Sequence, residues 1–197
     1  SEMCIRDRDK NQEKVLVVDY CAGSGAIALS IAKECSNVEV FAIEKSLEAF
    51  KYLEANYFKY ENEIKSQNSK VHLINADVNS EVIEINNLES KFDVVVSNPP
   101  YIPEKMVPKE IEVKDHDPAI ALYGGKDGLE IVRVVVGKAT NLLKTGGLLA
   151  IEHSDLQGNL DDELSVPYVL KSTNCFEKIE DRKDLNALPR YCVGFKK

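Results

Sequence analysis

Apolar and polar residues along this chain fall into two repeating kinds of block. Short runs rich in valine and isoleucine are typical of strands buried on both faces of a parallel sheet, and blocks with helical spacing lie between them. The short runs predict strands at residues 15–19, 38–44, 71–75, 92–97, 148–152, 176–180 and 191–195. The longer blocks predict helices at 26–33, from the N-cap Ser46 to about Tyr60, at 129–143 and at 156–164. This alternation predicts an α/β fold with a doubly wound, mostly parallel sheet and a C-terminal antiparallel hairpin.

Three stretches depart from this alternation. Residues 61–70 are mostly polar and predict a loop, and residues 79–88 predict a weak helix or an irregular segment. Residues 102–127 contain two prolines and are too long for a simple connection, so they predict a functional loop. We expect Gly146-Gly147 to end the helix that precedes it, and Pro167 to break or restart a helix.

Length and composition describe an ordinary globular domain. The chain has 197 residues, of which 44% are hydrophobic and 29% charged. No apolar run approaches the roughly 18 residues of a membrane span, so we expect no membrane association. Five cysteines without metal-type spacing predict a reduced, cytoplasmic protein with no metal site. The pattern of residues 1–8 does not continue into the next element, so we expect a non-native or disordered leader there and a domain at 9–197.

The charge balance bears on the kind of substrate. The chain carries 25 basic and 33 acidic side chains, a net charge of −8. Such a surface repels phosphate backbones unless a local basic patch offsets it, and the sequence has no dense run of lysine and arginine. The charge therefore favours a protein or a small molecule over a nucleic acid as the substrate, without excluding the nucleic acid.

A glycine-rich turn, Asp19-Tyr20-Cys21-Ala22-Gly23-Ser24-Gly25, joins the first predicted strand to the first helix. Glycines at 23 and 25 remove the side chains that would keep a ligand from the backbone, and the turn aims a helix N-terminus at that ligand. The turn lacks the lysine of a phosphate-binding loop and is not a full GxGxxG. Taken alone, it could equally be a tight structural turn.

Acidic residues follow the next two predicted strands. Glu44 closes the second strand, 19 residues after Gly25, where an acid can accept hydrogen bonds from ribose hydroxyls. Asp77 follows the third strand, where it can meet the exocyclic amine of an adenine, with the backbone of Val78 nearby. Taken singly, Glu44 could be a solvated residue at a strand end and Asp77 a turn residue. Together with the glycine turn they lie at the carboxyl ends of parallel strands, the edge where open α/β sheets bind ligands.

This set of features resembles the class I methyltransferases that use S-adenosylmethionine. In that family the glycine loop faces the methionine portion of the cofactor, the first acid holds the ribose and the aspartate lies by the adenine. The residues that the resemblance assigns to the cofactor are Asp19, Cys21, Ala22, Gly23, Ser24, Gly25, Glu44, Lys45, Asp77, Val78 and Asn98.

The motif Asn98-Pro99-Pro100-Tyr101 follows the fourth predicted strand at the same edge. An amide or aromatic amine nitrogen is a weak nucleophile, and needs hydrogen-bond acceptors on its NH₂ group and a fixed approach to the methyl carbon. The Asn98 side-chain oxygen and the Pro99 carbonyl can be those acceptors, two prolines stiffen the backbone, and Tyr101 can stack on a planar acceptor. We therefore predict Asn98, Pro99, Pro100 and Tyr101 as the catalytic residues, acting mainly by positioning.

The motif alone leaves base amines and glutamine amides open as acceptors. Further segments resemble the HemK-type release-factor glutamine methyltransferases, over about Val15 to Phe195. These segments are His116–Leu122 with Gly124–Leu129, Glu152-His153-Ser154 with Gln157-Gly158, and Asp181–Asp184 with Pro189-Arg190. The resemblance implies transfer of a methyl group from S-adenosylmethionine to the glutamine amide in the Gly-Gly-Gln loop of a peptide chain release factor. It also implies a cytoplasmic enzyme, which we expect to be a monomer.

The chain departs from the family pattern in a few places. Asp117 stands where the family usually has glutamate, Glu44 where aspartate is common, and Val78 where an aromatic residue is frequent. Pro167 interrupts a helix that is usually continuous in the family. Only about 14 residues precede the first predicted strand, so we expect the N-terminal helical domain, which in the family helps dock the substrate, to be missing. Two alternatives therefore stay open: a methyltransferase of base amines (adenine N6 or guanine N2), and a truncated fragment that binds cofactor without turnover.

Overall fold

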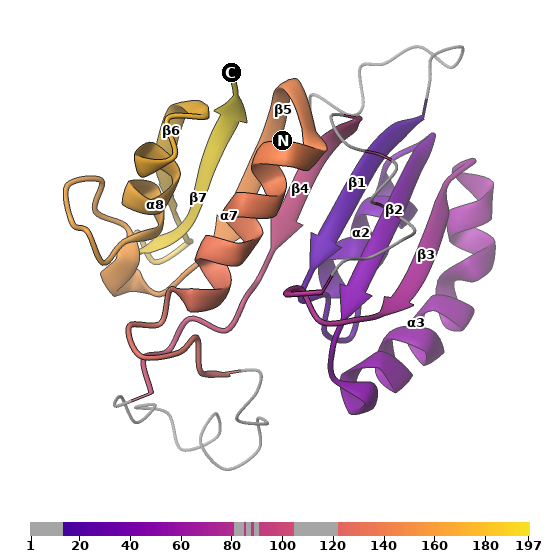
Figure 1. Cartoon of the computed structure of the whole chain (residues 1–197). Coiled ribbons are helices and arrows are strands. Elements are labelled where there is room, and N and C mark those ends of the chain that lie inside the picture. The colour runs from indigo at the N-terminus through magenta and orange to yellow at the C-terminus, as the bar shows by residue number, and fades with distance from the viewer. Residues whose placement is uncertain (1–13, 81–84, 86–87, 89–90, 105–121) are drawn as a thin grey trace.

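The computed structural model describes residues 14–80, 85, 88, 91–104 and 122–197. Within these residues one sheet of seven strands has the order β3-β2-β1-β4-β5-β7-β6 (Figure 1). The strands are β1 (Val15–Tyr20), β2 (Val38–Glu44), β3 (Lys70–Asn75), β4 (Phe92–Ser97), β5 (Leu143–Glu152), β6 (Phe176–Lys183) and β7 (Pro189–Lys196). The helices are α2 (Ala26–Glu34), α3 (Leu47–Ser66), α7 (Glu130–Leu142), the 3₁₀ turn η1 (Asp155–Gln157) and α8 (Val166–Ser172).

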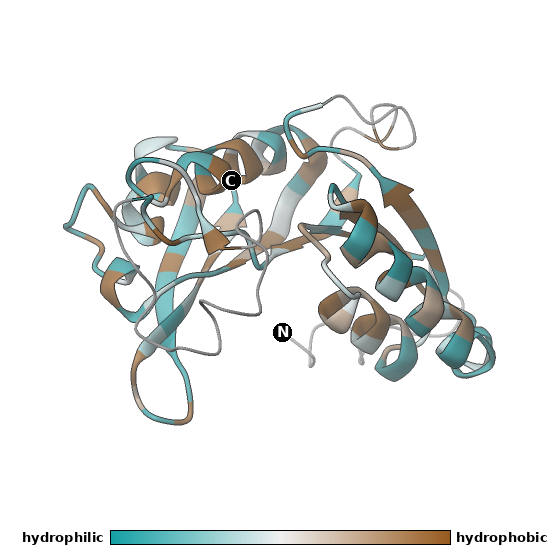
Figure 2. Cartoon of the chain, turned by 90° about the horizontal axis from the view of Figure 1, so that it is seen from below, coloured by the Kyte–Doolittle hydropathy of each residue, from teal (hydrophilic) through white to brown (hydrophobic). Residues whose placement is uncertain are grey.

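Two apolar cores lie on opposite faces of the sheet. Along β1, Val17 belongs to the core that α2 and α3 cover, whereas Val18 belongs to the core that α7 and α8 cover. Successive strand residues point to opposite faces, so a strand without polar alternation is buried on both sides. Figure 2 shows hydrophobic residues gathered along the strands between two layers of helices. The predicted doubly wound α/β fold is confirmed.

The strand order reverses between β1 and β4, which pair in parallel. From this point β2 and β3 extend the sheet one way and β5 the other, so the carboxyl ends of five parallel strands share one edge, at the bottom of Figure 1. Such a reversal leaves a crevice between the loops of neighbouring strands. The strand β7 runs antiparallel both to β5 and to its other neighbour, β6, which confirms the predicted C-terminal hairpin.

The second helix is longer than its polar composition suggests. The predicted loop at 61–70 is wrong, because α3 continues to Ser66. Leu53 and Ile64 are both buried on the face that packs against the sheet, with Tyr57 and Tyr60 partly buried between them, so the apolar stripe persists. An ion pair of 2.8 Å between Lys65 and Glu61 adds an i,i+4 contact on the exposed side.

The predicted helix at 156–164 is also wrong. Only the short η1 turn forms there, and Leu156 and Leu164 are 63% and 56% exposed, so this segment has no apolar face to bury. Side chains also bind backbone N–H groups that a helix would need for its own hydrogen bonds. Asn159 and Asp162 each accept a hydrogen bond from the backbone N–H two residues later.

The prediction that Pro167 breaks or restarts a helix is confirmed, whereas the prediction that Gly146-Gly147 ends one is wrong. Pro167 lies in the first turn of α8 after the N-cap Ser165, where proline costs no hydrogen bond, so it restarts the helix. The helix α7 ends at Leu142, and Gly146 and Gly147 lie inside β5, beside a register shift against β4. These glycines therefore shape a bulge and do not end the helix.

The predictions for residues 1–8 and for 105–121 lie outside the described residues, as does most of 79–88. Among the helices of the described residues, none combines the length and the apolar character needed to cross a bilayer.

Candidate active site at the carboxyl edge of the sheet

The glycine turn after β1 forms an open cradle. Gly25 is the N-cap of α2 with φ +88°, and a Cβ there would come closer than 3.0 Å to the side chains of Leu29 and Leu53. Gly23 has φ +57° and no atom within 4 Å of the position of a Cβ. Glycine adopts a positive φ without the steric cost of a side chain. The turn packs tightly at Gly25 and leaves open space at Gly23.

Asp19 lies beneath this cradle with an unused acceptor atom. Its Oδ2 accepts a hydrogen bond of 3.0 Å from the Ala28 backbone in α2, whereas its buried Oδ1 has no hydrogen-bond partner among the described residues. Burial raises the pKa of Asp19 to about 7, the Ala28 N–H opposes the rise and the nearby Glu44 charge adds to it. A cationic donor such as an ammonium group would satisfy the free oxygen, so this position fits the methionine end of S-adenosylmethionine.

Glu44 at the end of β2 has both carboxylate oxygens in use. Oε2 accepts 2.8 Å from Gly23 N, and Oε1 accepts 2.6 Å from Ser46 N. The acid therefore anchors the glycine turn, a role that the sequence reasoning missed. Each oxygen has a second lone pair, so two hydroxyl donors can still approach it.

Lys45 and Asp77 connect the ends of β2 and β3. The Lys45 ammonium lies 2.8 Å from Asp77 Oδ2, and the Asn79 backbone donates to Oδ1. The Lys45 contact holds the pKa of Asp77 below its usual value, so the carboxyl stays an acceptor at neutral pH. Val78 packs its side chain into the core, which leaves only its backbone for a ligand.

Cys21 and Ser97 lie at the centre of the edge. Cys21 has φ +61°, and burial, with the charges of Glu44 and Asp19, raises the pKa of its thiol to about 12. The thiol is therefore neutral and no nucleophile. The Ser97 hydroxyl donates 2.7 Å to the Tyr20 carbonyl, which ties the end of β4 to the end of β1. This bond brings the motif after β4 beside the glycine turn.

The motif after β4 presents one exposed polar side chain. Asn98 is exposed and its side chain has no hydrogen bond with any described residue, whereas Pro99 is buried. Beyond Tyr101 the backbone pairs with the segment before α7: Ile102 N donates to Leu122 O and Gly124 N donates to Ile102 O, both at 2.9 Å. The backbone of the motif is therefore held before it by Ser97 and after it by Ile102, while the Asn98 side chain stays available for a ligand.

Two glycines of the GGxDGL stretch pack directly on the motif. A Cβ on Gly124 would come closer than 3.0 Å to the Pro100 carbonyl oxygen, and a Cβ on Gly128 would do the same to the Tyr101 carbonyl oxygen. Asp127 between them accepts from Leu129 N at 3.0 Å and pairs with Arg133 at 2.6 Å. The arrangement explains why glycine stands at these two positions.

Gln157 also contacts the motif, and the sequence reasoning gave it no role. Its side-chain Nε2 donates 3.2 Å to the Tyr101 carbonyl. The buried His153 nearby has Nδ1 2.8 Å from Ser154 O and Nε2 2.9 Å from Asp181 Oδ1, the latter out of line for a hydrogen bond. Glutamine after a strand carries no distinctive signal, and only the family resemblance of the segment pointed to it.

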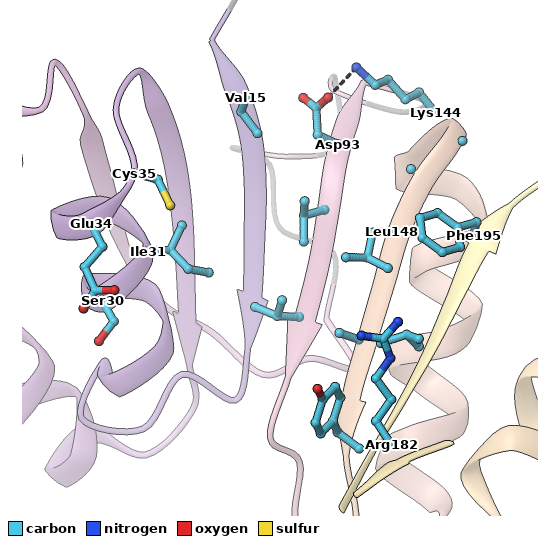
Figure 3. Close-up of a pocket in the computed structure, with 17 residues that line it drawn as sticks. Val15, Ser30, Ile31, Glu34, Cys35, Asp93, Lys144, Leu148, Arg182 and Phe195 are labelled. Carbon is cyan, nitrogen blue, oxygen red and sulfur yellow. Dashed lines mark ion pairs between the residues drawn. The ribbon is translucent and has the colours of Figure 1, made fainter. Parts of the chain in front are cut away.

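Figure 3 shows a second hollow, a groove of about 490 Å³ on the sheet face. Its floor is mostly apolar, with Leu148 and Phe195 opposite Ile31 of α2. Its buried acid, Asp93, already pairs with Lys144 and accepts from Leu16 N. Its Arg182 likewise pairs with Glu180, so these charged side chains are occupied by ion pairs and we place the candidate site at the carboxyl edge.

Comparison with known proteins identifies the family. The sequence model of the family described as methyltransferase small domain matches residues 2–114, more than half of the chain. The chain belongs to this methyltransferase family. A family of methyltransferases on this fold implies S-adenosylmethionine as the methyl donor, in accord with the fit at Asp19.

Relatives of this methyltransferase domain carry a more specific name. The chain is 36% identical over 184 residues to the release factor glutamine methyltransferase of Streptomyces coelicolor, covering 91% of this chain and 58% of the relative. It is 40% identical over 144 residues to that of Bifidobacterium longum, covering 73% of this chain and 49% of the relative. The chain thus spans about half the length of the curated relatives that it matches.

Solved structures support the fold of the domain. A methyltransferase from Pyrococcus furiosus superposes with a TM-score of 0.60 at 23% identity, covering 94% of this chain and 76% of the other. An rRNA methylase from Streptococcus thermophilus superposes with a TM-score of 0.56 at 17% identity, covering 94% and 89%. At these identities the likeness shows a shared class I methyltransferase fold and leaves the substrate open.

Proposed function

We propose that this chain is the catalytic domain of an enzyme that methylates the side-chain amide nitrogen of a glutamine in a peptide chain release factor. The observation that carries the proposal is the packing of Gly124 and Gly128 on the carbonyls of Pro100 and Tyr101. The stretch that distinguishes the glutamine-specific family thereby shapes the acceptor motif itself. The names of the relatives at 36% to 40% identity support the same acceptor.

S-adenosylmethionine, when bound, supplies an electrophilic methyl carbon on a sulfonium. Asp19 Oδ1 and the open side of Gly23 would hold the methionine end, Glu44 the ribose hydroxyls, and Asp77 with the Val78 backbone the adenine. Ala22 and Ser24 complete the turn, and Lys45 keeps Asp77 ionised.

At the acceptor side, the Asn98 side-chain oxygen and the Pro99 carbonyl would each accept one hydrogen of the substrate NH₂ group. These acceptors fix the plane of the amide and leave its nitrogen lone pair facing the methyl carbon, so the chain acts mainly by positioning. Tyr101 would stack on the planar amide. The methylated nitrogen then loses one proton to solvent, and the amide is neutral again.

An incorporation assay tests the proposal. The chain is incubated with S-adenosylmethionine labelled in the methyl group and, in separate reactions, an unmethylated release factor, a Gly-Gly-Gln peptide, DNA and RNA. We expect a mass increase of one methyl group on the glutamine, located by fragmentation, and none on a peptide with glutamate in its place. Methylation of nucleic acid alone would contradict the proposal. Binding of S-adenosylhomocysteine without any transfer would favour the inactive-fragment alternative.

A further inference from the structure

The side chain of Gln157 has a single orientation that its neighbours dictate. It is 5% exposed and lies at the end of η1. Its amide oxygen is 3.2 Å from Ser154 N and 3.1 Å from Ser154 Oγ. A backbone N–H can only donate, so the atom facing it must be the oxygen Oε1. The amide nitrogen Nε2 must therefore face the other way, toward the Tyr101 carbonyl 3.2 Å away.

This contact fixes one peptide group at both of its ends. The Tyr101 carbonyl oxygen accepts from Gln157, and the N–H of the same peptide, that of Ile102, donates 2.9 Å to Leu122 O. Gly128 packs beside the same contact, because a Cβ there would come closer than 3.0 Å to the Tyr101 carbonyl oxygen and would lie 3.1 Å from Gln157 Nε2. Because a peptide group is planar, its orientation is determined once both ends are bound.

The fixed peptide lies three residues after Asn98, and the intervening backbone is stiff. Pro99 and Pro100 have restricted φ angles, so they transmit the orientation of the Tyr101 peptide toward Asn98 with little freedom. The Asn98 end has no hydrogen bond of its own with the described residues. Asn98 therefore lies between two anchors, the Ser97 hydroxyl on the Tyr20 carbonyl before it and the fixed Tyr101 peptide after it.

We propose that Gln157 is a positioning residue for methyl transfer, which holds the Asn98–Tyr101 motif through the Tyr101 carbonyl. The expected effect on methyl transfer rests on the proposed function, whereas the hold of Gln157 on the Tyr101 carbonyl rests on the contacts alone. Gln157 touches neither Asp19, Glu44 nor Asp77, so its loss should act on the acceptor side and not on cofactor binding.

The variant Gln157→Glu separates this role from packing, because it keeps the shape and the oxygen that faces Ser154. Above the carboxyl pKa it places an oxygen against the Tyr101 carbonyl and repels it. Below that pKa the protonated carboxyl can donate to the carbonyl again, and burial should raise the pKa. We expect the kcat of Gln157→Glu at pH 8 to be at least about tenfold lower than that of the unaltered chain. As the pH is lowered to 6, the kcat of the variant should approach that of the unaltered chain.

The cofactor affinity of Gln157→Glu should stay within about twofold at both pH values, measured by calorimetry with S-adenosylhomocysteine. Gln67→Glu at the end of α3 is the matched control and should change neither kcat nor its pH profile. Gln157→Met, which cannot donate at any pH, should lose activity without recovery at low pH. A loss in Gln157→Glu that does not depend on pH would overturn the positioning role.

Hydrogen exchange tests the link without relying on activity. In Gln157→Glu at pH 8 we expect the amides of Ile102 and Glu104, which donate to Leu122 O and Gly125 O, to exchange about tenfold faster than in the unaltered chain. Amides of β1 should not change. Unchanged exchange at Ile102 would overturn the inference, even if the unaltered chain methylates glutamine. An unaltered chain that methylates no glutamine would instead contradict the proposed function.

Discussion

The carboxylate of Glu44 holds the backbone of Gly23, with 2.8 Å between Oε2 and the amide nitrogen. The acid at the end of β2 thus shapes the turn after β1, in addition to any contact that it makes with a ribose. Its second oxygen accepts from Ser46 N, where α3 begins. One buried side chain therefore joins two loops of the cofactor side, and its removal should disturb both.

We expect Glu44→Gln to weaken cofactor binding at least about tenfold, because an amide NH₂ must then face one of two backbone N–H donors. Calorimetry with S-adenosylhomocysteine measures the change. Glu39→Gln on the same strand, whose carboxylate contacts His72 and Lys70 away from the edge, is the control and should leave the affinity unaltered. An affinity within twofold in Glu44→Gln would show that the anchor is dispensable.

Asn98→Ala should abolish methyl transfer while leaving cofactor affinity within several-fold. The side chain is exposed and has no hydrogen bond with the described residues, so its loss costs the fold little. Single-turnover transfer to a Gly-Gly-Gln peptide, beside calorimetry and thermal unfolding, separates the three effects. Unchanged turnover would refute the acceptor role of Asn98.

Gly124→Ala should displace the acceptor motif, because the new methyl group would collide with the Pro100 carbonyl. We expect a large loss of transfer and a destabilisation of roughly 1–3 kcal/mol from overpacking, measured by urea unfolding. Gly137→Ala in α7 is the matched control, since no atom lies within 4 Å of its new Cβ. That control should be neutral or stabilise the chain by up to about 1 kcal/mol. Equal behaviour of the two variants would argue against the close packing.

Asp19 should make stability depend on pH. Its pKa is about 7 in the folded chain and near its ordinary 3.8 in the unfolded chain. Between these values the folded chain keeps a proton that the unfolded chain has lost, so the free energy of unfolding falls as pH rises from about 4 to about 7. Asp19→Asn lacks this titration. One proton changes the free energy of unfolding by about 1.4 kcal/mol per pH unit, so between pH 5 and 7 that of the unaltered chain should fall by about 2–3 kcal/mol more than that of Asp19→Asn. Urea unfolding at intervals from pH 5 to 8 measures this difference, and parallel curves would count against the raised pKa.

The sequence was sufficient for the features that rest on periodicity and on strand ends. Val17 and Val18 belong to opposite cores because the run around them has no polar alternation, and this indicated a sheet covered on both faces. The positions of Gly23, Glu44, Asp77 and Asn98 at one edge then follow from topology, since each lies at or just after the end of a parallel strand. The ligand contacts proposed for them stay predictions.

What the sequence could not provide depends on contacts between distant segments. The polar end of α3 is helical because Ile64 is buried against the sheet, which local composition does not reveal. The bond from Gln157 to Tyr101 spans 56 positions, and a glutamine after a strand looks like any surface residue. Leu156 and Leu164 resemble the apolar positions of a helix in the sequence, but among the described residues they stay exposed.

The two outermost strands of the sheet, β3 and β6, also determine how the chain behaves toward copies of itself. An outer strand leaves backbone groups unpaired, which another chain can join to build an aggregate. In β6 most side chains are charged, Lys178 has φ +49°, and the register shifts twice against β7, so its backbone offers no flat, regular template. At the other side β3 begins with the exposed Lys70 and ends with the exposed Asn75. These features discourage strands of other copies from pairing with β3 and β6. We therefore expect the domain to stay dispersed at the concentrations that these binding experiments require.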